Sequence, residues 1–137
     1  MITRLDHIAI AVEDLEASIK LWTAALKIES QAVEELPDRQ VRLAKLKAKN
    51  SPAIELVAAF GEDSPVAKSI ASRGEGIHHL CFQVTDIEQA LAELQKAGMR
   101  LIQEKPVLGA GGSRIAFLHP SNLNGVLIEL MELPQSE

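Results

Sequence analysis

The chain carries a near-copy of its own N-terminal motif, and this repeat restricts the possible folds more than any other feature. Residues 7–15 read HIAIAVEDL and residues 79–87 read HLCFQVTDI, an offset of 72 (79 − 7). A second element also recurs, AIELV around Glu55 and LIELM around Glu129, at an offset of 74 (129 − 55). Self-similarity at a nearly fixed period indicates that one supersecondary unit is used twice along the chain.

Each half is predicted to fold as a βαβββ module. In the first half, alternating apolar residues predict strands, and Pro- and Asn-containing breaks predict the turns between them. Asp14 is expected to cap a helix whose apolar residues recur at spacings of 4, 3 and 4. The strands of this module are expected near residues 4–12, 29–36, 40–47 and 53–60.

The second half repeats the same order after a short joining helix near residues 64–73, where serine is a good cap and proline suits the first turn. Asp86 is expected to cap the second module's helix and Gly98 to end it. The fold class is therefore predicted as α+β, a single domain of two tandem βαβββ modules forming a curved, cavity-enclosing mixed sheet. The modules are expected to span about residues 1–62 and 75–137. The later strands are expected near residues 77–84, 100–104, 113–119 and 125–132.

Strand parity links the repeat to chemistry. Successive side chains of a strand point to opposite faces, and the large aliphatic residues must face the helices. On each first strand the histidine has the other parity, and on each fourth strand a glutamate is flanked by two aliphatic residues that share the helix-facing side. If the two sheets curl toward each other, the side chains of one histidine and one glutamate from each half converge. These residues are His7, Glu55, His79 and Glu129.

Four such residues predict a divalent metal site. The separation between histidine and glutamate is 48 in the first half (55 − 7) and 50 in the second (129 − 79). Two imidazoles and two carboxylates suit Co, Ni, Mn, Fe or Zn, and the lack of thiolates argues against a closed structural zinc site. Octahedral coordination would leave two positions for substrate oxygens, so the ion could polarise a carbonyl and stabilise an enolate. The alternative for Glu55 is an exposed strand face or an ion pair with Lys45.

Four other features allow more than one interpretation. His78 adjoins His79, but strand alternation points it the opposite way, so His79 is preferred as the ligand. His119, before a proline, is typical of a turn. The Gly109-Ala110-Gly111-Gly112 stretch permits either close backbone approach to a phosphate or a flexible hairpin connection. Cys81 shares the parity of His79 and either lines the cavity or fills the core as a small apolar residue, which we favour.

Composition excludes several classes of function. A formal net charge of −5 argues against broad binding to nucleic acid or to anionic membranes. The single cysteine cannot form an intramolecular disulfide, which fits a reducing compartment. The N-terminal residues lack the apolar core and cleavage site of a secretory signal. We therefore expect a cytoplasmic protein that acts on a small molecule.

The segments HIAIAVEDLE, GEGIHHLCFQVTDI, GAGGSRIAFLHP and GVLIELME resemble the vicinal-oxygen-chelate superfamily. Within it the chain resembles the methylmalonyl-CoA epimerases over nearly its whole length. The resemblance implies paired βαβββ modules, a homodimer and one divalent metal ion at His7, Glu55, His79 and Glu129. It also implies interconversion of (2R)- and (2S)-methylmalonyl-CoA by metal-assisted removal of the α-proton through an enolate. Some members carry glutamine at the position of Glu55.

The proton-transfer residues depart from the pattern of this family. In one form of the epimerase a second catalytic glutamate aligns with Leu43, and leucine cannot transfer a proton. The expected acid–base residues here are therefore Glu129 and, in place of the missing glutamate, Glu55. The alternatives are a glyoxalase I-type lyase that acts on a hemithioacetal, or a non-catalytic ligand-binding member of the fold. Ring-cleaving dioxygenases usually use two histidines and one carboxylate, so the second glutamate counts against them.

Overall fold

The computed structural model describes residues 1–135 and separates into two compact units. Unit 1 comprises Met1–Asp6 together with the described residues from His79 onward, and unit 2 comprises His7–His78. Strand β1 (Ile2–Ala11) therefore contributes its first residues to unit 1 and its remaining residues to unit 2.

Unit 2 is a mixed sheet in which β1 runs parallel to β5 and β5 pairs antiparallel with β4. The strand order is β2–β4–β5–β1, and β3 also pairs with β4. A 3₁₀ turn over Pro37–Arg39 joins β3 to β4. The strands are β2 (Glu29–Ser30), β3 (Glu34–Leu36), β4 (Val41–Lys47) and β5 (Ala53–Ala59).

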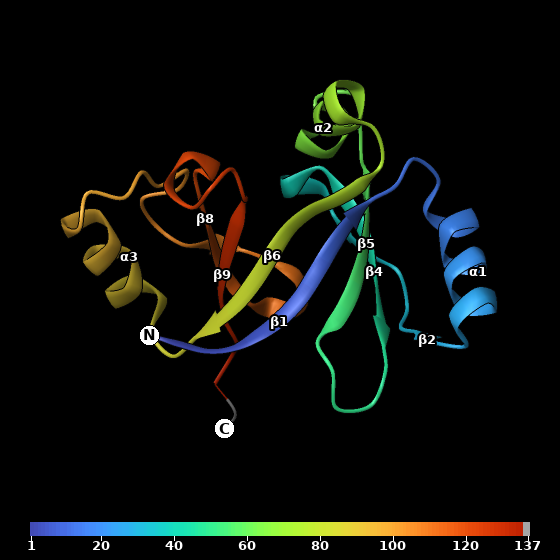
Figure 1. Ribbon diagram of the computed structural model, residues 1–137, viewed down its shortest axis with the longest axis horizontal. Coiled ribbons are helices and arrows are strands. Elements are labelled where there is room, and N and C mark those ends of the chain that lie inside the picture. The colour runs from blue at the N-terminus through green and yellow to red at the C-terminus, as the bar shows by residue number, and fades with distance from the viewer. Residues whose placement is uncertain (136–137) are drawn as a thin grey trace. The chain divides into compact units, whose positions relative to one another are not determined.

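Two capped helices complete unit 2 (Figure 1). Helix α1 (Leu15–Leu26) begins where the Asp14 carboxylate accepts a 3.0 Å hydrogen bond from the Ala17 N–H. Helix α2 (Pro65–Arg73) begins at Ser64, whose hydroxyl oxygen accepts a bond from the Val66 N–H. The apolar stripe of α1 packs against even-numbered residues of β4 and β5. The buried members of this cluster are Val12, Leu15, Ala44, Leu46, Leu56 and Ala58.

Unit 1 has the strand order β1–β6–β9–β8–β7, with β6 parallel to β9. The first residues of β1 are tied to β6, because the Thr3 hydroxyl donates to the Gln83 carbonyl and the Gln83 amide donates to Asp6 at 2.6 Å. The strands are β6 (Gly76–Val84), β7 (Val107–Leu108), β8 (Arg114–Leu118) and β9 (Ile128–Glu132).

Helix α3 (Ile87–Lys96) covers one face of the sheet of unit 1. The Asp86 carboxylate caps it by accepting from the Gln89 N–H at 3.1 Å. Its buried residues pack on the even-numbered positions of β8 and β9, as α1 does on β4 and β5. The buried cluster contains Val84, Ile87, Ala90, Leu91, Ala116, Leu118, Ile128 and Leu130.

The order of elements confirms the α+β class and the use of βαβββ twice, with α2 between the two halves. One predicted strand is wrong. Residues 100–104 form only an isolated bridge, Leu101 to Leu118, and the strand that precedes β8 lies later, at β7. The physical reason is that the Gln103 side-chain oxygen accepts the Phe117 N–H at 2.7 Å and replaces a backbone partner. The expected strand over 29–36 is interrupted between β2 and β3.

Within the described residues, no helix is long and apolar enough to cross a membrane.

The packing of the helix-facing core of unit 2 predicts that truncation of a buried leucine lowers the free energy of unfolding much more than truncation of an exposed one. Leu56 is fully buried on β5, whereas Leu21 on α1 is 67% exposed. Because truncation of Leu56 leaves a cavity, Leu56→Ala should lower the free energy of unfolding by about 2–5 kcal/mol. Leu21→Ala is the control and should change it by less than about 0.5 kcal/mol. Urea unfolding followed by circular dichroism measures both, and equal effects would contradict this packing.

Candidate functional site

Unit 2 holds one buried histidine–glutamate pair on the face of its sheet that is turned away from α1. His7 lies on β1 and Glu55 on β5, where Ala9 is the register partner of Glu55. His7 Nε2 and Glu55 Oε2 are 3.5 Å apart, and the residues are 3% and 5% exposed. Small neighbours on this face, Ala9 and Ala53, leave room for both side chains.

Unit 1 holds a matching pair on the face turned away from α3. His79 on β6 lies two residues before Cys81, which is the register partner of Glu129 on β9. His79 Nε2 and Glu129 Oε1 are 3.0 Å apart, and the two residues are 6% and 7% exposed. The ring of Phe117 packs edge-on against the His79 ring, with centroids 5.2 Å apart and an interplanar angle of 89°. An apolar wall therefore orients this histidine.

The two pairs share their chemistry but differ in the residue opposite the glutamate. On β4, Lys45 is the register partner of Glu55, as the alternative of an ion pair requires. On β8, Phe117 is the register partner of Glu129. Directly opposed residues of an antiparallel pair share one face, so a lysine stands opposite one glutamate and a phenylalanine opposite the other. Parity alone could have identified Phe117, which the sequence analysis did not single out.

The spacing within each pair fits a shared metal ion. Bonds from a divalent ion such as zinc to imidazole nitrogen and carboxylate oxygen are about 2.0–2.2 Å long, so neighbouring ligand atoms lie about 3.0–3.5 Å apart. The observed separations are 3.5 Å in unit 2 and 3.0 Å in unit 1. Burial of a carboxylate is costly unless a positive group compensates it, and a divalent ion does so. Each pair, taken separately, is therefore suited to ligation.

The remaining histidines have the positions expected for them. His78 is half-buried on β6, and it is the neighbouring His79 that pairs with Glu129. His119 is a turn residue, because its Nδ1 accepts the Ser121 N–H at 3.0 Å at the start of the 3₁₀ turn Pro120–Asn122. This outcome confirms the expectation for His119.

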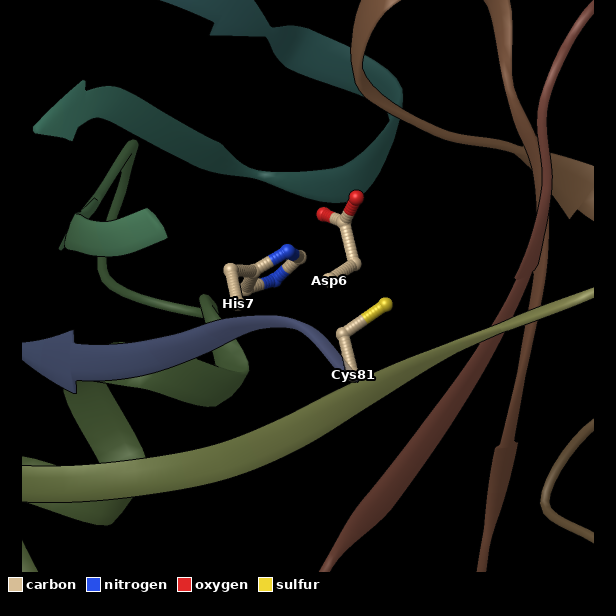
Figure 2. Close-up of side chains that lie close together, drawn as sticks. All are labelled: Asp6, His7 and Cys81. Atoms are coloured by element: carbon tan, nitrogen blue, oxygen red, sulfur yellow. The ribbon is translucent and has the colours of Figure 1, made fainter. Parts of the chain in front are cut away.

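Cys81 is a core residue of unit 1. It is fully buried and packs with Ile115 and Met131, which agrees with the interpretation as an apolar filler. Its Sγ also lies within 4.8 Å of an Asp6 oxygen. Figure 2 shows these two side chains, together with His7, which follows Asp6 along β1.

The glycine-rich stretch is a hairpin connection. β7 pairs antiparallel with β8 through Val107 and Ile115, and the turn between them is the 3₁₀ segment Ala110–Gly112. The Gly109 N–H donates to the Ser113 carbonyl at 2.9 Å, and the Ser113 hydroxyl donates to the Ala110 carbonyl at 2.7 Å, so that both bonds close the turn. The hairpin alternative is therefore confirmed.

Comparison with known proteins identifies clear relatives. Residues 6–117 match the family described as the glyoxalase/bleomycin resistance protein/dioxygenase superfamily. The ethylmalonyl-CoA/methylmalonyl-CoA epimerase of Cereibacter sphaeroides is 40% identical over 135 residues, which cover 97% of this chain and 100% of that protein. The mitochondrial methylmalonyl-CoA epimerase of Homo sapiens is 35% identical over 128 residues, covering 93% of this chain and 72% of that protein.

A solved structure has the same fold. A variant of Streptomyces coelicolor methylmalonyl-CoA epimerase, in complex with 2-nitronate-propionyl-CoA, superposes with a TM-score of 0.94 at 36% identity. The superposition covers 100% of this chain and 99% of that one. This agreement confirms the predicted α+β fold of paired βαβββ modules.

The hairpin leaves too little space for a side chain at Gly109. A Cβ added at Gly109 would lie 2.7 Å from Ile115 Cγ2 and 2.9 Å from Ser113 Oγ. Because this turn has little space for a methyl group, Gly109→Ala should lower the free energy of unfolding by about 1–3 kcal/mol. Thermal unfolding followed by circular dichroism measures the change. An unchanged midpoint would show that the hairpin accommodates the methyl group without strain.

Proposed function

This chain belongs to the glyoxalase/bleomycin resistance protein/dioxygenase superfamily, and we propose that it is an epimerase that interconverts (2R)- and (2S)-methylmalonyl-CoA. The observation that carries the proposal is the 40% identity, over 97% of the chain, to a protein named for this reaction. The two buried histidine–glutamate pairs support it, because removal of an α-proton requires carboxylates in a site from which water is largely excluded.

The proposed metal ligands are His7 and Glu55 of unit 2 with His79 and Glu129 of unit 1. The spacing inside each pair and the mixed nitrogen and oxygen donors support a divalent ion among Co, Ni, Mn, Fe and Zn. When bound, such an ion acts as a Lewis acid that stabilises negative charge on the thioester and carboxylate oxygens of the substrate.

Glu129 is the proposed acid–base residue on one side of the substrate. The α-carbon of methylmalonyl-CoA lies between a thioester and a carboxylate, so its proton is acidic enough for a carboxylate oxygen to accept it. His79 Nε2 lies 3.0 Å from Glu129 Oε1 and orients this carboxylate. The edge-on ring of Phe117 holds His79 in place and helps to exclude water.

Inversion of the α-carbon needs a second acid–base residue, because the proton must return to the opposite face. Leu43 cannot supply it. The repeat offers Glu55, the counterpart of Glu129, for this second role.

The proposed partners follow from the same assignment. The substrate is a small acyl-CoA, and the protein is proposed to act as a homodimer in the cytoplasm, without nucleic-acid or membrane partners. The net charge of −5 and the single cysteine support this setting.

The metal proposal predicts a selective loss of bound ion. His79→Ala removes one of the four proposed ligands, so the purified protein should lose most of its metal after loading with Co²⁺ and desalting. His119→Ala is the matched control, because His119 belongs to a turn. Elemental analysis of the wild type and both variants measures the ratio of metal to protein. Equal metal content in all three proteins would contradict the assignment.

The reaction itself predicts exchange of the substrate α-proton. Metal-loaded wild-type protein incubated with (2R)- or (2S)-methylmalonyl-CoA in D₂O should incorporate deuterium at C2 with loss of chirality. Glu129→Gln should reduce kcat by about 10²–10⁴-fold, the usual contribution of an acid–base residue. Metal content is measured on the same samples, so that loss of the ion is distinguished from loss of the base. Turnover of a hemithioacetal without exchange would instead identify a glyoxalase I-type lyase.

A further inference from the structure

Strand β3 carries two consecutive glutamates that belong to opposite faces of the sheet of unit 2. Glu35 is the register partner of Arg42 on β4, and its Oε1 lies 3.7 Å from Arg42 Nε. The Arg42 guanidinium also binds the Glu16 carboxylate of α1, and this hydrogen bond raises the pKa of Arg42 above its usual value. Glu35 therefore belongs to the face that carries α1.

Glu34 belongs to the other face, the one that carries the histidine–glutamate pair. Its register partner on β4 is Leu43, and the partner of Leu43 on β5 is Val57. Val57 lies two residues after Glu55, so the two share a face. Glu34 is half-buried at this position, whereas Glu35 is exposed.

The position of Leu43 relates Glu34 to the proton transfer of the proposed reaction. Leu43 is 5% exposed and occupies the place where the resemblance expects a proton-transferring glutamate. Residues directly opposed on antiparallel strands have Cβ atoms about 4.5–5.5 Å apart. Glu34 therefore lies on the same face as the glutamate expected at position 43, and only one strand away from it.

The geometry points to Glu34, rather than Glu55, as the second acid–base residue of the reaction, in place of the glutamate expected at position 43. This inference rests on the proposed epimerase function. Glu55 is buried 3.5 Å from His7, an arrangement that suits a ligand. Glu34 has no place in the proposed ligand set, and its partial exposure lets its proton exchange with solvent.

The proton transfers balance without an added reactant. When Glu129 accepts the α-proton, the electron pair of the broken C–H bond stays on the substrate as the enolate. The protonated Glu34 carboxyl then donates its proton to the opposite face of the α-carbon, forming the new C–H bond. The reverse reaction uses the same two groups in exchanged roles, and solvent resets their protonation.

The test compares Glu34→Gln with Glu35→Gln, its neighbour on the other face. Each metal-loaded protein is incubated with (2R)- and, separately, (2S)-methylmalonyl-CoA in D₂O, and proton NMR and chiral analysis follow exchange and inversion. Glu34→Gln should reduce the rate of epimerisation by at least about 100-fold. It should still exchange the α-proton of one stereoisomer, without inversion, because Glu129 remains. Glu35→Gln should still exchange and invert both stereoisomers.

A rescue variant separates a lost proton donor from a damaged fold. Glu34→Gln combined with Leu43→Glu moves the carboxylate by one strand and should restore inversion, whereas a structural defect at residue 34 would persist. The inference is overturned if Glu34→Gln inverts both stereoisomers as fast as Glu35→Gln. If the wild-type protein itself fails to exchange the α-proton, the proposed function fails instead.

Discussion

The two-residue periodicity of the β-strand is the constraint on which the rest of this structure depends. In each unit, strands pack aliphatic side chains against a helix, so residues of the other parity must occupy the opposite face. That face receives a histidine and a glutamate in both units, with Nε2 and carboxylate oxygens 3.5 and 3.0 Å apart. A shift of one residue in register would expose the core of the unit and turn its histidine and glutamate toward the helix.

The sequence duplication explains the residues that the two units share. The positions at which the units differ can supply what an epimerase needs beyond a metal site. Inversion requires one acid–base group on each face of the substrate, in addition to the residues that would bind a metal ion. The units differ where a lysine stands opposite Glu55 and an aromatic ring opposite Glu129. They differ again at the edge of unit 2, where β3 brings a further carboxylate opposite Leu43.

Local signals predicted most of the fold. The caps at Asp14, Ser64 and Asp86 were identified from residue type, because capping depends on neighbours only a few residues away. The strand expected over 100–104 was wrong because the Gln103 side chain occupies a backbone donor of β8, a contact across 14 residues that no local pattern encodes. The role of Glu34 was missed for the same reason, since its strand is short and its partner is set by register.

The sequence by itself determined the repeat, the class of each element and the four residues proposed as metal ligands. These follow from periodicity and residue chemistry, which are properties of short segments. Only the tertiary structure decided that each histidine lies beside the glutamate of its own unit, that Phe117 packs on His79, and that Glu34 stands opposite Leu43. Such relations depend on strand pairing and register. Long-range packing selects the register, and the sequence of a single strand does not specify it.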